Sequence, residues 1–492
     1  MRRLTVGTAA MIVTVTAVSA PALSATAAST ESITAGLPSA KFPLGVPGIP
    51  KSAVKALGAG IEYFTLKHGT PEDGYTVSLL SAGKDFMSET TAQNLAVSAQ
   101  TAGFEPTVVQ FTRPAIADFP AQDFWMVRIG SWTLKQKKDA AETVADLKDA
   151  GLSAKVDYLG DDGFLTSGPW QMRIVTVDPR SFRGTFASSL GASTAKREKV
   201  SAMAKAGGAS IAVNGGFFDI HTSAAYRGDP TGISVVGGKL LSEAVPGRTA
   251  IVLKGKTARI TELASKTTVT TNGANTPVAG VNRVPKPNEL VLYTEEFGAK
   301  TPSTGGAEAV LDADGQVLAV RDAGGKVTKG RRVLHGVGTA ADWVRAYASE
   351  GQVLTVKTTV SDLRRKRTMV LTPDTYIVGG GVGLVRNGRT WITASADGMA
   401  NVNMILRRHP RTLVGVTKTG KLLLAVVDGR APGTTVGASF LEAAQVMRWL
   451  GARDAINLDG GGSSAMVVKG KVVNKPSDGS ERAVGDALLV RF

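Results

Sequence analysis

Residues 454–464 read Asp-Ala-Ile-Asn-Leu-Asp-Gly-Gly-Gly-Ser-Ser, and this stretch decides the fold expected for the second half of the chain. Its apolar start predicts a strand over 454–458, where Asn457 and, one step beyond, Asp459 point to one side because side chains alternate along a strand. Three glycines follow at once, and glycine lets the backbone turn tightly and approach a bound group closely. The sequence therefore predicts a strand whose end carries an amide, a carboxylate and a Gly-rich loop.

Short strands with glycine turns dominate the rest of this half. From Gly168 onward the patterns predict strands at 172–178, 210–213, 232–236, 250–253, 310–311, 317–320 and 422–427, and a hairpin at 465–468 and 471–473. One helix is expected over 436–450, with Thr434 or Thr435 as its N-cap. Because strands outnumber helices and do not alternate with them, we predict an α+β fold. Residues 165–492 should form a mixed, mostly antiparallel sheet domain with Gly-rich loops at strand ends.

An internal repeat occupies residues 74–160. Strand patterns at 75–79 and 125–129 lie 50 positions apart (127 − 77 at their centres), and each is followed by a helical stretch. Those stretches end at glycines 48 positions apart (151 − 103), and further strands are expected at 107–111 and 154–158. The order β-α-β occurs twice, which predicts a small ferredoxin-like βαββαβ domain ahead of the sheet domain.

The two halves of this repeat resemble the SPOR domain, a sporulation-related repeat that binds cell-wall glycan. The resemblance rests on Ile129-Gly130-Ser131-Trp132, which is similar to the Gly-Ser-aromatic strand end of that family, while the first copy has Leu80-Ser81-Ala82-Gly83. It implies that residues 74–160 bind peptidoglycan or an anionic wall polymer. A small packing module with no ligand is the alternative.

Residues 1–28 have the pattern of a cleaved signal peptide. Arg2-Arg3 precede an apolar run from Leu4 to about Ala20, and small residues follow at 25–27. A membrane anchor is the alternative, but the run contains four threonines, a serine and a glycine and is short for a bilayer span. Residues 29–73 are rich in Ala, Gly, Ser and Pro, which predicts a linker that leads into a strand near 61–66. We expect a secreted protein, extracellular or associated with the cell wall, with no membrane segment after cleavage.

The composition limits the partners and the kinds of active site that this protein can have. The chain carries 57 Lys and Arg against 41 Asp and Glu, a formal charge of +16, and this positive charge favours an anionic partner. For an exported protein, an anionic cell wall is a better partner than nucleic acid. There is no cysteine, so disulfides, thiolate metal sites and cysteine nucleophiles are excluded. The 4 histidines include no His-Glu-x-x-His motif, and no spacing of possible ligands identifies a metal site. We predict no cofactor.

Three further polar clusters stand at expected strand ends or in loops. Asn214-Gly215-Gly216 ends the strand 210–213, Arg407–Thr412 precedes a strand, and Asp428-Gly429-Arg430 ends the strand 422–427. Asn-Gly and Asp-Gly are also common in plain turns, and a run of arginines can be a solvated loop. Each of these clusters therefore has a structural alternative.

Six motifs together resemble those of the phosphodiester glycosidase family, in the order of that family. They are Asn214-Gly215-Gly216-Phe217-Phe218, Gly228-Asp229-Pro230, Gly247-Arg248-Thr249-Ala250, Pro410-Arg411-Thr412, Asp428-Gly429-Arg430 and Asn457-Leu458-Asp459-Gly460-Gly461-Gly462-Ser463-Ser464. The resemblance covers roughly residues 165–492. Val382 departs from it, since bacterial relatives often carry proline in the Gly-Gly-Gly-Pro loop.

The resemblance implies hydrolysis of the bond between a sugar anomeric carbon and a phosphodiester, with N-acetylglucosamine as one candidate sugar. A carboxylate helps an oxocarbenium-like transition state, and a phosphate leaving group needs little protonation. Our hypothesis gives Asp459 the carboxylate role, Asp428 that of a second carboxylate, and Asn214 contact with sugar hydroxyls. The expected substrate-binding set is Arg411, Arg248, Arg430, Asn457, Gly460, Gly461, Gly462, Ser463 and Ser464.

Two other functions compete with this hypothesis. A non-catalytic protein that binds cell-wall polymer would use similar surface chemistry, and only turnover separates it from the enzyme. Nucleic-acid binding rests on charge alone, and the sequence shows neither a stacking platform nor a basic helix, so we predict no nucleic-acid partner.

Overall fold

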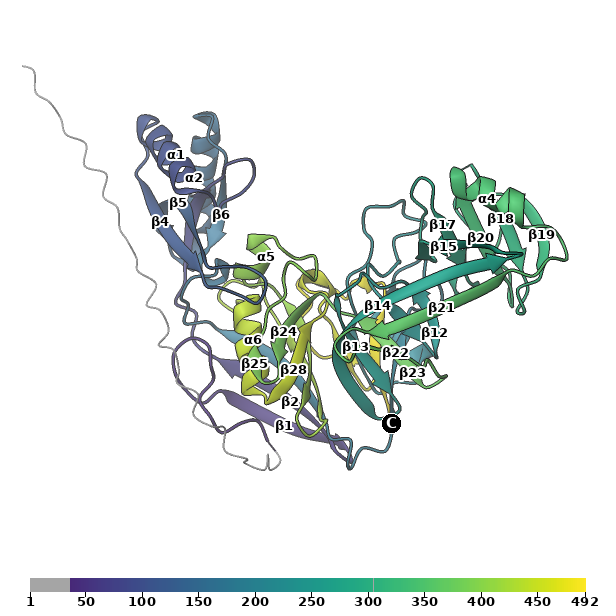
Figure 1. Ribbon diagram of the computed structural model, residues 1–492. Coiled ribbons are helices and arrows are strands. Elements are labelled where there is room, and N and C mark those ends of the chain that lie inside the picture. The colour runs from purple at the N-terminus through teal and green to yellow at the C-terminus, as the bar shows by residue number, and fades with distance from the viewer. Residues whose placement is uncertain (1–35, 304) are drawn as a thin grey trace, which may run out of the picture.

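A computed structural model describes residues 36–303 and 305–492 of the chain (Figure 1). The signal peptide expected at 1–28 lies outside the described residues. Strands far outnumber helices and almost all neighbouring strands are antiparallel, which confirms the predicted α+β, mostly antiparallel fold. Within the described residues, no helix is both long enough and apolar enough to cross a membrane.

Two antiparallel sheets face each other at the centre of the molecule. The first has the order β1 (Lys51–Gly58), β2 (Ile61–His68), β7 (Trp170–Val177), β27 (Leu422–Val427), β26 (Arg411–Thr417), β28 (Ala452–Asn457), β24 (Val382–Arg386), β25 (Arg389–Thr390). The second has the order β30 (Lys471–Val472), β29 (Met466–Val468), β10 (Ile211–Asn214), β32 (Ala487–Arg491), β8 (Thr185–Ser189).

The layer between these two sheets is apolar because alternate side chains of both point into it. Leu424 of β27 packs there with Ile211 and Leu488 of the second sheet. The opposite face of β27, with Leu423 and Ala425, packs in a separate apolar cluster. Because β27 is buried on both faces, its sequence is a continuous apolar run, and its bounds agree with the strand predicted at 422–427.

The hairpin β1–β2 forms the edge of the first sheet. β2 pairs with β7 in antiparallel register, from Ile61 opposite Val177 to His68 opposite Trp170. The strand expected near 61–66 is therefore confirmed, but the linker expected over 29–73 is wrong in extent, since residues 51–68 belong to the sheet. Seven of the eight residues of β1 are exposed, so apolar periodicity could not reveal this strand.

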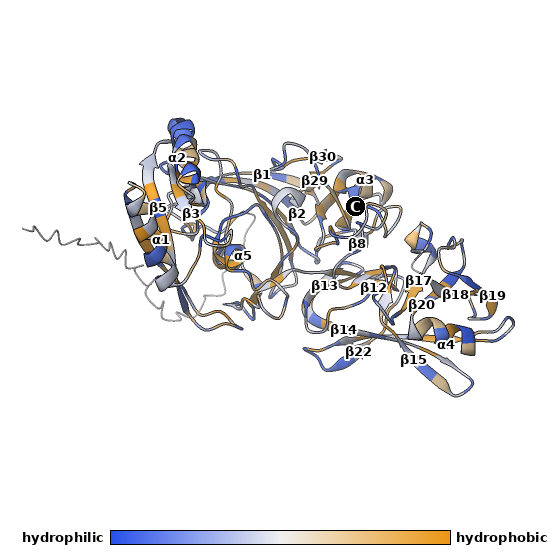
Figure 2. Cartoon of the chain, turned by 90° about the horizontal axis from the view of Figure 1, so that it is seen from above, coloured by the Kyte–Doolittle hydropathy of each residue, from blue (hydrophilic) through white to orange (hydrophobic). Residues whose placement is uncertain are grey.

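Residues 75–158 form a small domain that follows the order expected from the internal repeat. Its elements are β3 (Tyr75–Leu79), α1 (Glu89–Thr101), β4 (Pro106–Arg113), β5 (Gln122–Trp132), η1 (Leu134–Gln136), α2 (Lys137–Asp149) and β6 (Ala154–Tyr158). The antiparallel sheet has the order β4-β5-β3-β6, and the surface of α2 is largely hydrophilic (Figure 2). Gly103 and Gly151 follow the two helices with φ of +89° and +78°, a left-handed conformation that glycine adopts readily.

This small domain is inserted between two adjacent strands of the first sheet. It follows β2 and precedes β7, and these two strands pair with each other. The Thr70 N–H donates to the Ser167 carbonyl (3.0 Å), so the two ends of the insertion lie side by side.

The inserted domain also docks on the sheet domain through a buried ion-pair cluster. The Arg407 guanidinium donates to both carboxylate oxygens of Asp157 (2.9 and 2.7 Å) and to Asp85. Nearby, the Gly433 N–H donates to the Tyr158 hydroxyl (3.2 Å). The loop between β27 and α6 (Phe440–Trp449) is thus held against the inserted domain.

A second pair of sheets extends from the other side of the sandwich (Figure 1). One has the order β12 (Lys239–Ser242), β11 (Ser234–Val236), β23 (Thr375–Gly379), β13 (Thr249–Lys254), β14 (Thr257–Thr271), β21 (Thr355–Asp362), β22 (Arg367–Met369), with β15 (Ala274–Val278) beside β14. The other has the order β16 (Gly280–Val281), β17 (Leu290–Tyr293), β20 (Arg332–Val337), β18 (Gly306–Leu311), β19 (Val317–Asp322), and α4 (Thr339–Tyr347) packs on it.

The helix α6 (Phe440–Trp449) begins later than the helix predicted over 436–450. Its N-cap is Ser439, whose hydroxyl accepts from the Glu442 N–H (3.1 Å) while the Glu442 carboxylate accepts from the Ser439 N–H (2.9 Å). Gly437 has φ of +89°, which no α-helix residue adopts. The N-cap expected at Thr434 or Thr435 is therefore wrong.

The remaining short elements are β9 (Glu198–Lys199), α3 (Val200–Ala206), η2 (Leu159–Asp161), η3 (Glu295–Phe297), α5 (Val402–Leu406), η4 (Gly461–Ser463) and β31 (Ala483–Val484). The Gly-rich loops after β10, β23 and β28 meet at one edge of the sandwich. Gly216 lies so close to Gly379 that a β-carbon on Gly216 would stand 2.2 Å from the Gly379 carbonyl oxygen. This edge collects most of the residues that the sequence singles out.

Candidate functional site

The Gly-rich loop after β28 holds Asp459 at this edge. The Asp459 N–H donates to the Gly215 carbonyl (3.0 Å), and its carboxylate accepts from the Gly460 N–H (2.8 Å). Burial raises the pKa of Asp459 to about 6, against the opposing influence of the Ser463 hydroxyl, the Gly460 N–H and the charge of Arg482. A carboxyl group with this pKa exchanges its proton near neutral pH, as catalytic carboxyl groups do.

The side chain of Asn214, at the end of β10, makes all of its hydrogen bonds to other groups of the protein. Its Nδ2 donates to the carbonyls of Asp459 (2.9 Å) and Gly215 (3.2 Å). Its Oδ1 accepts from the Thr412 hydroxyl (2.6 Å) and the Ala465 N–H (3.1 Å). A side-chain amide has no further donor or acceptor to offer, so the geometry gives Asn214 a positioning role in place of the expected contact with sugar hydroxyls.

We expect Asn214→Ala to lower the free energy of unfolding by about 3 kcal/mol, because truncation leaves a buried hydroxyl and a buried N–H without acceptors. Urea unfolding measures this change. Asn94→Ala, at an exposed position on α1, is the control and should change stability by less than about 0.5 kcal/mol. An Asn214 variant as stable as this control would contradict the positioning role.

A second buried carboxyl group, Asp486, stands beside Asp459. The Gly215 N–H donates to the Asp486 carbonyl (2.8 Å), so Gly215 bridges the two residues through its backbone. Gly215 has no room for a β-carbon, which would lie 2.2 Å from Asp486 Oδ1. Burial raises the pKa of Asp486 to about 7; the Gly216 N–H lowers it and the charge of Asp459 raises it.

The sequence prediction missed Asp486. Gly485-Asp486 precedes the strand β32 and, read alone, is an ordinary turn. Its place follows from the antiparallel pairing of β10 with β32, in which Asn214 lies opposite Ala487. A signal was present, since the start of a strand that pairs with 210–213 must lie beside Asn214, but the pairing itself cannot be read from local sequence.

We expect Asp486→Asn to remove a pH dependence of stability. Because the folded-state pKa of Asp486 lies above its ordinary value, the native state holds a proton that the unfolded chain lacks between about pH 4 and pH 7. This contribution is full below that range and is lost as the pH rises through about 7. Relative to wild type, the variant should therefore gain about 2–4 kcal/mol between pH 4 and pH 8 in urea unfolding. Asp314→Asn, at an exposed turn, is the control, and parallel pH curves for wild type and Asp486→Asn would contradict the assignment.

Two arginines cover the Gly-rich loop. A β-carbon on Gly461 would lie 3.1 Å from both terminal nitrogens of Arg430, and one on Gly462 would lie 2.2 Å from both Nη2 of Arg482 and Oδ2 of Asp478. Arg482 also pairs with Asp478 (2.6 Å). Glycine at these two positions lets both guanidinium groups approach the loop backbone closely, next to Asp459.

His409 lies neutral beside these arginines. Burial, and after it the charges of Arg411 and Arg430, lower the pKa of His409 to about 3. Arg430 Nη2 lies 3.4 Å from His409 Nδ1. Arg430 has φ of +56°, a left-handed conformation that costs a residue with a side chain about 1 kcal/mol or more. Such strain clusters at functional sites, which supports the predicted role of Arg430.

Arg411 supports the same loop from inside the fold. Its Nε donates to the Ala438 carbonyl (2.9 Å) and its Nη2 to the Met404 carbonyl (2.8 Å), while its guanidinium lies 4.1 Å from the centre of the Phe440 ring. Burial lowers the pKa of Arg411 to about 9, so it stays charged at neutral pH, and this charge favours the ionised form of Asp459. The residue expected to hold phosphate is thus largely committed to backbone carbonyls.

Asp428 braces the loop from the neighbouring hairpin. Its Oδ1 accepts from the Asn474 amide (3.3 Å) and the Lys475 N–H (3.1 Å), and Asn474 donates in turn to the Ser464 carbonyl (3.0 Å). Burial raises the pKa of Asp428, against the Lys475 N–H. The contacts of Asp428 are those of a residue that positions Ser464.

Several buried polar atoms at this edge have no hydrogen-bond partner among the described residues. They are Asn457 Oδ1, Ser464 Oγ and Asp428 Oδ2. Such atoms are rare inside proteins, and a cluster of them marks a place where a bound group can supply the missing partners. The backbone N–H groups of the Gly-rich loop, in contrast, already have partners. The Gly460 N–H donates to Asp459 Oδ1 (2.8 Å) and the Gly461 N–H donates to the Pro410 carbonyl (2.9 Å), so neither faces a ligand as expected.

Arg248 lies on another wall of the site. It lines a narrow crevice with Phe217, Gly380 and Asp486, and its guanidinium donates to the Thr231 carbonyl. Burial lowers the pKa of Arg248, and its Nε has no hydrogen-bond partner in the described part of the chain. The structure therefore places Arg248 beside Asp486, away from the pair of arginines over the Gly-rich loop.

The site joins a buried carboxyl pair, Asp459 and Asp486, to the guanidinium groups of Arg430 and Arg482. A carboxylate stabilises a cationic centre, and guanidinium groups bind phosphate oxygens in a bidentate manner. Across residues 36–303 and 305–492, no group of three or more His, Asp or Glu side chains is arranged to hold a metal ion.

Comparisons with known proteins point to the same half of the chain. Residues 305–491 match the family model described as phosphodiester glycosidase. The SPbeta prophage-derived uncharacterized protein YomE of Bacillus subtilis (strain 168) is 36% identical over 112 residues, which are 23% of this chain and 17% of that protein. The N-acetylglucosamine-1-phosphodiester alpha-N-acetylglucosaminidase of Mus musculus is 33% identical over 119 residues, 22% of each chain. The chain thus spans about a fifth of the length of these curated relatives.

Solved structures resemble the chain over much more of its length. A Burkholderia pseudomallei K96243 protein described as exported is 28% identical, with a TM-score of 0.80 over 93% of this chain and 99% of that one. A hypothetical protein from Synechocystis, 16% identical, has a TM-score of 0.55 over 90% of this chain and 81% of that one, and shows the fold alone.

Proposed function

We propose that this protein is a secreted hydrolase that cleaves the bond between a sugar anomeric carbon and a phosphodiester. The observation that carries the proposal is the pair of guanidinium groups, Arg430 and Arg482, packed over the Gly-rich loop beside the buried carboxyl groups of Asp459 and Asp486. The match of residues 305–491 to the phosphodiester glycosidase model supports it.

In the proposed reaction, a water molecule adds to the anomeric carbon while the bond from that carbon to the phosphodiester oxygen breaks. The electron pair of this bond leaves with the phosphate, and the attacking water passes one proton to the surrounding solvent. Arg430 and Arg482 hold the phosphate and stabilise its negative charge, so the leaving group needs little protonation. Ionised Asp459 stabilises the positive charge that develops on the sugar ring.

Asp486 affects the ionisation of the carboxyl pair that it forms with Asp459. Two neighbouring buried carboxyl groups do not ionise together readily, because the first negative charge opposes the second. Burial raises the pKa of both carboxyl groups, and the charge of Asp459 raises the pKa of Asp486 further. The pair therefore holds one proton more readily than two isolated carboxyl groups would.

We further propose that the chain is exported and that residues 74–160 bind peptidoglycan or an anionic wall polymer. Export is supported by the charged and apolar pattern of residues 1–28 and by the similar Burkholderia protein, which is described as exported. Wall binding is supported by the β-α-β-β-α-β order of the inserted domain and by the strand-end motif Ile129-Gly130-Ser131-Trp132.

The direct test is incubation of the purified protein with UDP-N-acetylglucosamine, followed by chromatography for free N-acetylglucosamine and UDP. Release of both in equal amounts is the expected result. Failure to release sugar from this compound and from a polymeric sugar 1-phosphate, with retained binding to isolated cell walls, would favour a non-catalytic wall-binding protein.

A further inference from the structure

Residues 474–482 cross the Gly-rich loop as a strap that is fixed near both of its ends. At the start of the strap, Asn474 Nδ2 donates to the Ser464 carbonyl (3.0 Å). Near its end, the Glu481 carboxylate accepts from the N–H (2.8 Å) and the hydroxyl (2.6 Å) of Ser201. The side chains that the strap places over the Gly-rich loop are therefore positioned by the fold.

Two of these side chains, those of Asp478 and Arg482, lie against the same glycine of the loop. A β-carbon on Gly462 would stand 2.2 Å from Asp478 Oδ2 and 2.2 Å from Arg482 Nη2. Arg482 donates to this carboxylate oxygen through Nε (2.7 Å) and Nη2 (2.6 Å), and the remaining N–H groups of its guanidinium can still bind a phosphate oxygen. The phosphate that Arg482 is proposed to hold must therefore bind next to a carboxylate.

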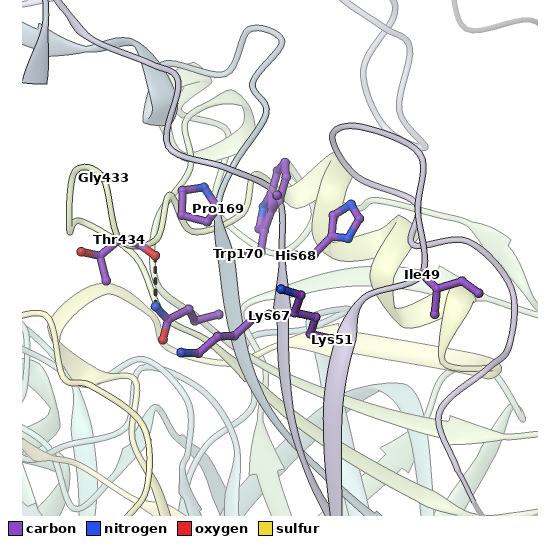
Figure 3. Close-up of a pocket in the computed structure, with 10 residues that line it drawn as sticks. Ile49, Lys51, Lys67, His68, Pro169, Trp170, Gly433 and Thr434 are labelled. Carbon is purple, nitrogen blue, oxygen red and sulfur yellow. Dashed lines mark hydrogen bonds between the residues drawn. The ribbon is translucent and has the colours of Figure 1, made fainter.

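The second arginine over the loop, Arg430, has no such counterion. It forms no ion pair with a carboxylate of the described residues, and its Nη2 lies 3.4 Å from His409 Nδ1. The loop that carries Arg430 is fixed in turn, because Gln171 Nε2 donates to the Thr434 carbonyl (3.1 Å), the bond drawn in Figure 3. The two arginines thus bring two positive charges to the loop, and Asp478 offsets one of them.

One remaining positive charge matches a phosphodiester better than a phosphate monoester. A phosphodiester carries one negative charge, whereas a monoester carries about 1.5 to 2 at neutral pH, because its second pKa is about 6. The extra charge of a monoester would lie beside the Asp478 carboxylate, and an opposing like charge selects against the ligand that carries it. The effect reaches the proposed reaction centre: burial raises the pKa of Asp459, and the charge of Arg482 opposes this rise.

We propose that Asp478 is a specificity-determining residue, which selects sugar phosphodiesters against sugar phosphate monoesters by offsetting the charge of Arg482 and repelling the second charge of a monoester. The inference rests on the proposed function and deepens it, because it says which phosphate esters the site accepts. Asp478 takes no part in breaking the bond, so its removal widens the range of substrates and leaves the reaction on a diester largely intact.

The test compares wild type with Asp478→Asn on N-acetylglucosamine 1-phosphate and on its methyl phosphodiester, two substrates that differ by one methyl group and one charge. At about pH 8, the preference of wild type for the diester, as a ratio of kcat/KM values, should fall about tenfold in the variant through a gain on the monoester. On the diester, kcat/KM should stay within about threefold, since asparagine can still accept from Arg482. Asp314→Asn, which removes one negative charge at an exposed turn, is the control and should leave the ratio unchanged.

The pH dependence of this ratio distinguishes charge selection from a role in packing. At about pH 5 the monoester carries about one negative charge, so the ratios of wild type and Asp478→Asn should converge. Both proteins contain Asp459, so the loss of activity at low pH cancels from the ratio. A difference between the two proteins that is as large at about pH 5 as at about pH 8 would overturn the proposed role of Asp478.

Binding of inorganic phosphate separates this inference from the reaction. Phosphate is titrated calorimetrically into wild type, Asp478→Asn and Asp314→Asn at about pH 8, and we expect about tenfold tighter binding for Asp478→Asn alone. If this tightening occurs but the diester is not turned over, the role of Asp478 stands and the proposed reaction falls. If the diester is turned over but neither the ratio nor phosphate binding depends on Asp478, the reaction stands and the role of Asp478 is overturned.

Discussion

The Asp459→Asn variant is expected to lose about 10³-fold or more in kcat on UDP-N-acetylglucosamine while keeping its fold. Asparagine has the shape of aspartate and can still accept from the Gly460 N–H, but it carries no charge to oppose the cation on the sugar ring. The measurement is the rate of sugar release at saturating substrate. Because burial raises the pKa of Asp459 to about 6, activity of the wild type should also fall below about pH 6 as this carboxylate gains its proton.

Thermal unfolding must accompany this comparison. The neutral side chain removes an electrostatic cost of burial, so the melting temperature of Asp459→Asn should equal or exceed that of wild type. Asp314→Asn, on an exposed turn, controls for the loss of one negative charge and should keep full activity. An Asp459→Asn enzyme with more than about a tenth of the wild-type rate would remove Asp459 from the mechanism.

The second large effect is expected from Arg407→Met, which should lower the free energy of unfolding by about 3 kcal/mol. Arg407 is buried and pairs with Asp157 and Asp85 of the inserted domain. Burial alone would raise the pKa of both carboxyl groups, but the charges and hydrogen bonds of Arg407 and Lys155 together outweigh it, and the pKa of each is lowered. Methionine leaves two buried carboxylates with Lys155 as their remaining cation. Urea unfolding measures the loss, and limited proteolysis shows whether the inserted domain has come away.

The pairing can be distinguished from a packing defect by rescue. Adding Asp85→Asn and Asp157→Asn to Arg407→Met removes the uncompensated charges and should recover about half of the lost stability. The loss should also shrink at about pH 4, where the carboxylates of the single variant gain protons. Arg345→Met removes an exposed pair with Asp342 (3.5 Å) and should change stability by less than about 0.5 kcal/mol. Equal losses with and without the two Asn substitutions would contradict the ion-pair account.

Local patterns were enough to predict the elements that local forces determine. The continuous apolar run at 422–427 predicts a buried strand, and the glycines at 103 and 151 predict two helix ends. The structure confirms both predictions. The start of α6 was predicted too early, because the apolar pattern continues back to Val436 while the Ser439–Glu442 capping box places the true start later.

Some residues of the candidate site could not be predicted, because the pairing of distant strands brings them there. Asp459 was predicted from the glycines that follow it, and the structure places it at the edge of the sandwich. Asp486 reaches the site only because β32 pairs with β10, and Arg482 only because its chain folds over Gly462. Asn214 was found for its position, but its role as a brace depends on partners from three distant segments.

The insertion of a whole domain between two paired strands bears on how the protein folds during synthesis. A total of 101 residues separate His68 from Trp170 (170 − 68 − 1), yet these two residues lie opposite each other in the sheet. Closing an unfolded loop of that length costs entropy that grows with the logarithm of its length. The Thr70–Ser167 hydrogen bond brings the two ends of the folded insertion together, so a domain that folds as it leaves the ribosome already presents β2 at the place where β7 will emerge. A folded inserted domain therefore lowers the entropic cost of pairing β2 with β7.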